Sequence, residues 1–98
     1  VDEDERSLVP DAFTLSQNYP NPFNPSTTIL YSLKTDATVA IQVFDIMGRN
    51  IGTLVEGRRQ AGQYSIFWKP ANVASGVYFY RLQVNGEVVE MRKMTLMK

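Results

Sequence analysis

The sequence contains no cysteine and no histidine among its 98 residues. The absence of cysteine excludes a disulfide-stabilised fold, but it does not fix the compartment, since cytosolic and bacterial exported proteins can both lack disulfides. Without these two residue types the chain lacks the commonest general base and the thiolate nucleophile. No other nucleophile has an evident base at a recognised spacing. We therefore expect no catalytic residues, and the protein is not expected to be an enzyme.

Long hydrophobic runs and metal-binding patterns are also absent. No apolar run approaches the roughly 18 residues of a membrane-spanning helix, so no membrane span is expected. The acidic stretch from Asp2 to Glu5 lacks the glycine and the periodic ligands of a calcium loop, and we expect no metal and no cofactor. The formal net charge is zero. The slight basic excess after residue 6 is too small to indicate nucleic-acid binding.

Hydrophobic residues make up 44% of the chain and aromatic residues 11%, which is enough for the packed core of one domain. Residues 1–11 are acidic, contain Pro10 and show no hydrophobic period, as a solvated linker does. The domain is expected to cover residues 12–98. The chain starts with neither an initiator methionine nor a signal peptide, which we interpret as a start inside a longer protein.

Turn residues recur along the domain at intervals of about 8 to 12 positions, a spacing typical of a sandwich or barrel. Between them apolar and polar residues alternate, as they do in half-buried strands. Because no segment has a convincing helical period, we predict an all-β, immunoglobulin-like antiparallel sandwich of about seven strands. The expected strand segments are 13–19, 27–33, 38–45, 50–55, 63–68, 77–84 and a last one that begins near residue 87.

Two connections stand out by composition. Three prolines in the segment 20–25 remove backbone donors and exclude a helix or a central strand, so a stiff, extended connector is expected there. Residues 57–62 are expected to form a polar, basic loop. Four cations could form a basic patch, although scattered loop cations are usually only solvated: Arg49, Arg58, Arg59 and Lys69.

Two turns can be assigned to particular residues. In the segment 45–49, Gly48 can adopt a positive φ and Asp45 can accept hydrogen bonds from nearby backbone amides. The pair Asn85–Gly86 also tolerates positive φ and predicts a two-residue type I′ hairpin, with Gly86 as its key residue.

The hairpin turn also predicts a register for the last two strands. It sets three pairs of residues opposite each other: Leu82 and Val89, Tyr80 and Met91, and Arg81 and Glu90. Arg81 and Glu90 would then form an exposed ion pair. Continued without interruption, this register would turn Met94 and Leu96 outward, so we predict a bulge near Arg92–Lys93.

The aromatic residues fall into an inner and an outer set. Trp68 alternates in step with Tyr64 and Ile66 and is expected in the core, although an exposed tryptophan could stack on a sugar ring. Phe67 and Phe79 would lie on outer faces and are candidates for surface contacts.

The segment 75–80 resembles a tyrosine corner, in which a tyrosine near the start of a strand bonds back to earlier backbone. Tyr80 would occupy a core position. Tyr78, Phe79 and Tyr80 could alternatively form an aromatic ligand platform, but alternation turns adjacent rings to opposite faces.

One longer pattern resembles a known family. The stretch LSQNYPNPFNPSTTI (15–29) looks like the opening of the type A sorting domains of the type IX secretion system, which close many exported proteins of Bacteroidetes-type bacteria. The likeness continues through FDIMGR (44–49), AGQYSIFW (61–68), ASGVYFYRL (74–82) and RKM (92–94). These pieces occur in the family's order.

The resemblance implies a location, a set of partners and a set of residues. The domain would sit at the C-terminus of a passenger, which is exported through the periplasm to the cell surface or medium. An outer-membrane translocon would recognise it, a sortase-like protease could remove it, and it would be a monomer that binds no nucleic acid. The implied recognition residues are Gly76, Tyr78, Lys93, Met94, Leu96 and Lys98. Pro22, Asn24 and Pro25 would fix the start of the domain.

Two other functions remain possible on the sequence alone. The chain could be an accessory carbohydrate- or surface-binding module of an extracellular enzyme, or a spacer between domains. A sugar-binding module needs two or more rings on one open face, whereas Tyr64, Trp68, Tyr78 and Tyr80 are all expected on core faces.

Overall fold

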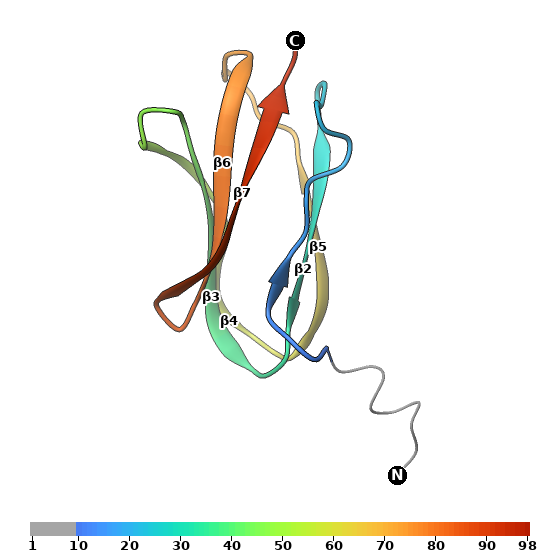
Figure 1. The fold of residues 1–98 in the computed structure, drawn as a ribbon, viewed down its shortest axis with the longest axis vertical. Coiled ribbons are helices and arrows are strands. Elements are labelled where there is room, and N and C mark those ends of the chain that lie inside the picture. Colours follow the sequence, from blue (N-terminus) through green and yellow to red (C-terminus); the bar gives the residue numbers. More distant parts are fainter. Residues whose placement is uncertain (1–9) are drawn as a thin grey trace.

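The computed structural model describes residues 10–98, so the expected linker lies almost entirely outside the described residues. Seven strands form two antiparallel sheets that face each other, which confirms the predicted all-β sandwich (Figure 1). The strands are β1 (Thr14–Leu15), β2 (Thr27–Leu33), β3 (Ala37–Phe44), β4 (Asn50–Arg59), β5 (Gly62–Trp68), β6 (Gly76–Val84) and β7 (Glu87–Leu96). One sheet has the order β1-β2-β5 and the other β4-β3-β6-β7.

The core lies between the sheets and is built from alternate residues of β2, β3, β6 and β7. Its members are Leu15, Phe23, Ile29, Tyr31, Leu33, Ala37, Val39, Ile41, Val43, Tyr78, Tyr80, Leu82, Val84, Met94 and Leu96. The Oη atom of Tyr78 donates a hydrogen bond to the carbonyl of Ala74 at 2.5 Å, which confirms the tyrosine corner. Tyr80 is completely buried, and its hydroxyl donates to the carbonyl of Ser16 at 2.6 Å. This second bond ties β6 to the opposite sheet.

Strand β5 carries Tyr64 and Trp68 on the core side, as predicted, but both are only half-buried. Tyr64 stacks on Tyr31 with a centroid separation of 5.0 Å, and Trp68 packs against Phe23 at 5.9 Å. The partial exposure follows from the position of β5 at the edge of its sheet, where it has a neighbour on one side only.

The predicted loop at 57–62 is wrong, because β4 extends to Arg59 and only Gln60 and Ala61 connect it to β5. Gly57 and Arg58 pair with Val39 and Thr38 of β3. The extension has no hydrophobic alternation, since β4 is an edge strand with no fully buried residue. A strand that presents little apolar surface to the core leaves no periodic signal in the sequence.

The predicted hairpin turn is confirmed, but the predicted register is wrong. Asn85 and Gly86 have φ values of 51° and 88°. The observed pairs are Val84 with Glu87, Leu82 with Glu90, Arg81 with Met91, Tyr80 with Arg92 and Tyr78 with Met94.

The strands shift register between Leu82 and Gln83, so the bulge lies beside the turn and not at residues 92–93. Because of this shift, Met94 and Leu96 point into the core and Lys93 is exposed. The predicted Arg81–Glu90 ion pair is also wrong, because Glu90 pairs instead with Arg92 at 2.6 Å.

Replacing Gly86 by valine is expected to lower the free energy of unfolding by about 1–3 kcal/mol, because a β-branched residue is strained at positive φ. The added Cβ would meet no atom within 4 Å, so backbone strain alone causes the loss. Urea denaturation measures it. The matched control is Glu87→Val on the neighbouring exposed residue, and an equal loss in both variants would contradict the turn assignment.

Candidate functional site

The proline segment, residues 20–25, is not the extended connector that its composition predicts. The chain bends on both sides of Phe23, whose side chain is only 1% exposed and lies in the core. One apolar residue among turn-forming residues is thus inserted between the sheets. Pro22, Asn24 and Pro25 flank it and are exposed.

Backbone bonds join the proline segment to the end of β7. The amide of Phe23 donates to the carbonyl of Thr95 at 2.9 Å, and the amide of Met97 donates to the carbonyl of Phe23 at 3.0 Å. The Oδ1 atom of Asn21 accepts a bond from the amide of Thr95 at 3.0 Å. Phe23 and Leu96 therefore form a parallel bridge along the outer edge of β7.

Two further bonds extend this contact along β7. Gln17 donates through Nε2 to the carbonyl of Lys93 at 2.7 Å, and Arg92 donates through Nε to the carbonyl of Leu15 at 2.7 Å. We call these contacts between residues 15–23 and residues 92–97 the clasp. It covers the C-terminal half of an edge strand whose backbone groups would otherwise be open to pairing.

The polar residues of the 15–29 motif hold the proline segment in place. Asn18 is buried, and its amide nitrogen bonds to the carbonyl of Pro20 at 3.1 Å and to Oγ1 of Thr27 at 3.0 Å. Thr27 Oγ1 also donates to the carbonyl of Pro20 at 2.9 Å. The motif thus fixes Phe23 against β7. Sequence reasoning missed this role because the backbone partners of Phe23, Thr95 and Met97, lie at the other end of the chain.

The implied recognition residues fall into a buried and an exposed group. Tyr78 and Met94 form one cross-strand pair, Gly76 and Leu96 another, and the side chains of Tyr78, Met94 and Leu96 are buried. Lys93 and Lys98 are exposed. In the folded domain, the buried residues can shape the surface, whereas only the two lysines can present side-chain charge to a partner.

The remaining predicted positions have structural roles. Gly48 has a φ of 83°, and Asp45 Oδ1 accepts bonds from the amides of Met47 and Arg49 at 2.9 Å, as predicted. These backbone bonds, with the guanidinium of Arg49, lower the pKa of Asp45 below its usual value. Arg49 is paired with Asp45 at 2.8 Å. Arg58 and Arg59 are adjacent in β4 and point to opposite faces, so the four cations form no single patch.

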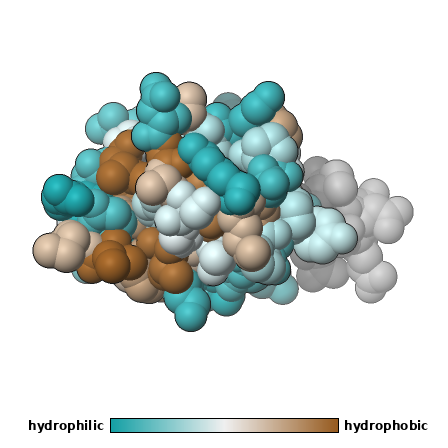
Figure 2. Space-filling model, turned by 90° about the horizontal axis from the view of Figure 1, so that it is seen from above, coloured by the Kyte–Doolittle hydropathy of each residue, from teal (hydrophilic) through white to brown (hydrophobic). Residues whose placement is uncertain are grey.

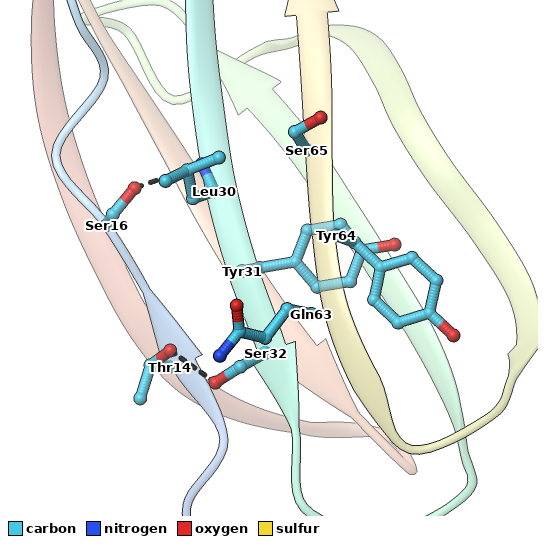
Figure 3. Close-up of a pocket in the computed structure, with 8 residues that line it drawn as sticks. All are labelled: Thr14, Ser16, Leu30, Tyr31, Ser32, Gln63, Tyr64 and Ser65. Carbon is cyan, nitrogen blue, oxygen red and sulfur yellow. Dashed lines mark hydrogen bonds between the residues drawn. The ribbon is translucent and has the colours of Figure 1, made fainter. Parts of the chain in front are cut away.

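A shallow cavity of about 460 Å³ lies on the outer face of the three-stranded sheet (Figure 3). It is lined by Thr14, Ser16, Leu30, Tyr31, Ser32, Gln63, Tyr64 and Ser65. Thr14 and Ser32 bond to each other, and Ser16 Oγ accepts a bond from the amide of Leu30. The lining contains no carboxylate, amine or guanidinium, so it offers no group suited to acid–base catalysis near neutral pH.

Within residues 10–98 no cluster of three or more carboxylates is arranged to hold a metal ion. In the same part of the chain, no helix is long and apolar enough to cross a membrane.

Burial raises the pKa of Tyr80 to about 12. The folded state therefore holds this proton more tightly than the unfolded chain, whose tyrosines titrate near pH 10. The resulting stability is complete below about pH 10 and is lost as the pH approaches 12, a fall of about 2 kcal/mol in the free energy of unfolding. Denaturation at a series of alkaline pH values tests this. Tyr80→Phe should show a clearly shallower decline, and an unchanged decline would contradict the assignment.

The structure is that of a small immunoglobulin-like sandwich with a clasped edge strand and two exposed lysines near the end of that strand. The family can be stated more narrowly. The chain belongs to the secretion system C-terminal sorting domains, whose family model matches residues 17–97. The match runs from the opening motif through β7, and it confirms the resemblance found in the sequence. The chain thus has a secretion-sorting role.

A solved structure shares the fold. The chain is similar to part of the alkylpurine DNA glycosylase AlkC from Pseudomonas fluorescens, solved bound to DNA containing an abasic site analogue, with a TM-score of 0.50 and 13% sequence identity. The similarity covers 97% of this chain and 33% of that chain, so the present chain spans about a third of its length. At this identity the likeness shows the fold alone. Comparison with curated proteins finds no match.

Proposed function

We propose that the domain directs a passenger, attached at its N-terminal side, to the type IX translocon at the outer membrane. The observation that carries the proposal is the family match over residues 17–97, with the motif at its start bonded to the strand at its end. The domain acts by being recognised and not by catalysis, and it needs no cofactor. A sortase-like protease could then remove it once the passenger reaches the surface.

In this proposal the buried recognition residues maintain the shape of the binding surface, and the exposed ones supply its charge. Gly76, Tyr78, Met94 and Leu96 support the part of the sheet where β6 begins and β7 ends, and Lys93 and Lys98 are exposed there. Exposed charges mainly speed the encounter of two proteins and select the partner. In this proposal the translocon presents carboxylates to the two lysines, while the buried residues keep those lysines in position.

The experiment is export of a passenger fused to the domain, in a host that has the type IX system, scored by cell fractionation. The double variant Lys93→Ala with Lys98→Ala should lower the surface fraction about tenfold, since the lost interactions act in recognition. The matched control changes two other exposed cations, Arg58→Ala with Lys69→Ala. If the wild-type fusion stays in the periplasm, or if both double variants are exported equally well, the proposal fails.

One observation favours the carbohydrate-binding alternative as a second candidate. Tyr19 and Phe67 are 81% and 70% exposed, and both stand opposite Thr28 on the outer face of the three-stranded sheet. Two strand spacings separate them by about 10 Å. This pair is not among the residues on which the sequence argument against sugar binding rests, which are Tyr64, Trp68, Tyr78 and Tyr80. Affinity electrophoresis in a gel that contains a neutral soluble polysaccharide tests this function. Slower migration of the wild-type domain, lost in Tyr19→Ala and Phe67→Ala, would establish it. Migration unaffected by the polysaccharide would exclude it.

A further inference from the structure

A second cavity, of about 260 Å³, lies on the outer face of the four-stranded sheet, at the end that carries the β3–β4 turn. We call it the Arg81 groove. It is lined by Phe44, Asp45, Ile46, Gly48, Phe79, Arg81 and Met91. Phe44 pairs with Phe79, and Arg81 with Met91, so these side chains lie next to one another across three strands. Viewed from this end, apolar side chains gather over part of the surface (Figure 2).

Arg81 is the unusual member of this lining. Its guanidinium lies over the ring of Phe44, 4.6 Å from the centroid, and Nη2 bonds to Oε1 of Gln42 at 3.2 Å. The Nε atom is buried and has no hydrogen-bond partner. A guanidinium has five donors in a planar fork that matches a carboxylate. Arg81 thus carries a positive charge on an apolar face with most of its donors unused by the described residues.

The nearby carboxylates do not neutralise Arg81. Asp45 also lines the groove, but its two oxygens accept bonds from Arg49 and from the turn amides, and its pKa is lowered by these bonds. Glu90 is paired with Arg92 at 2.6 Å. Within residues 10–98 the groove therefore keeps a cation without a carboxylate partner, which favours an anionic group on whatever binds there.

The surroundings of the groove indicate the shape of such a ligand. Ile46 is 69% exposed and Met91 about half exposed, so the groove presents apolar surface that a partner can cover. Within the described residues, the clasp covers β7 from Arg92 onward, and the outer edge of Glu87–Met91 has no strand beside it. An extended segment can add to this edge and place alternate side chains over the groove.

We propose that the Arg81 groove binds an extended, acidic and apolar segment of the secretion machinery. A carboxylate of that segment bonds to the terminal nitrogens of Arg81, and its apolar side chains cover Met91. The proposal rests on the proposed function, because the partner is a component that the sorting domain meets during export. It adds a binding site beside Lys93, which pairs with Phe79 on the same face of the sheet.

The test uses the same passenger fusion and compares two neighbouring residues of one turn. Ile46→Asp puts a carboxylate into the groove, where it pairs with Arg81 and repels an acidic ligand. Met47→Asp makes the same change at a residue that is 74% exposed but does not line the groove. The surface-exported fraction should fall at least about tenfold in Ile46→Asp, as expected for loss of a charge-assisted bond. It should stay within about twofold in Met47→Asp.

A second pair of variants tests the charge itself. Arg81→Gln removes the charge and should also lower export about tenfold, whereas Arg58→Gln, at a cation on the same face outside the groove, should not. Circular dichroism of each isolated variant shows that the sandwich is still folded. Normal export of the Ile46→Asp and Arg81→Gln fusions would contradict the proposed binding site and leave the sorting function intact. An equal loss of export in Met47→Asp would do the same. Retention of the wild-type fusion would overturn both.

Discussion

Replacing Phe23 by alanine is expected to lower the free energy of unfolding by about 3–5 kcal/mol, as for other fully buried phenylalanines. The side chain is 1% exposed, packs against Trp68 and belongs to the core cluster. Its loss would leave a cavity between the sheets and loosen the clasp, whose central backbone bonds are those of Phe23. A small domain has only about 5–15 kcal/mol of stability in total.

Denaturant-induced unfolding followed by circular dichroism measures this loss. The matched control is Phe67→Ala, because Phe67 is also a phenylalanine but is 70% exposed. It should lower the free energy of unfolding by less than about 1 kcal/mol. Equal losses in the two variants would mean that Phe23 is not buried in the folded domain.

Deletion of Thr95–Lys98 should unfold the domain. A terminal edge strand usually makes few buried contacts, so its removal would ordinarily leave a folded, weakened sandwich. In the structure, Leu96 is 1% exposed and pairs with Gly76, and the backbone of Thr95 and Met97 holds Phe23. Loss of one buried leucine costs about 2–5 kcal/mol, and each lost hydrogen bond adds about 1 kcal/mol.

A shorter deletion serves as the matched control for this loss of stability. Removing only Met97–Lys98 takes away two exposed side chains and two hydrogen bonds, from the Met97 amide to Phe23 and from the Lys98 amide to Ser75, so the isolated domain should stay folded with a loss of about 1–3 kcal/mol. Thermal unfolding of the two truncated domains decides the matter. If the longer deletion melted like the shorter one, Leu96 could not be part of the core.

Strands with one buried face were predictable from the sequence. The segments 27–33 and 77–84 alternate because one side of each contacts the core, and their bounds agree closely with β2 and β6. The Asn85–Gly86 turn was predictable for a local reason, since two successive residues with positive φ restrict the possible side chains.

The missed features depend on partners far away in the chain. The burial of Phe23 is set by Leu96 and Trp68, which no local pattern around the proline segment indicates. The position of the bulge in β7 depends on which residues of the strand reach the core. The observed register differs from the predicted one by one residue, so Arg81 pairs with Met91 and not with Glu90. The resemblance implied six recognition residues, but only the structure shows that three of them, Tyr78, Met94 and Leu96, are buried.

The clasp has a consequence for the order of folding. Its side-chain bonds join residues 74 to 77 positions apart, whereas the β6–β7 hairpin closes over the two residues Asn85 and Gly86. Closing so long a loop costs entropy that is recovered only when the intervening strands are already paired. Sandwiches rich in such distant contacts fold within about milliseconds to seconds. The hairpins should therefore form early, and the side of the sandwich held by the clasp should be the last part to close and the first to open.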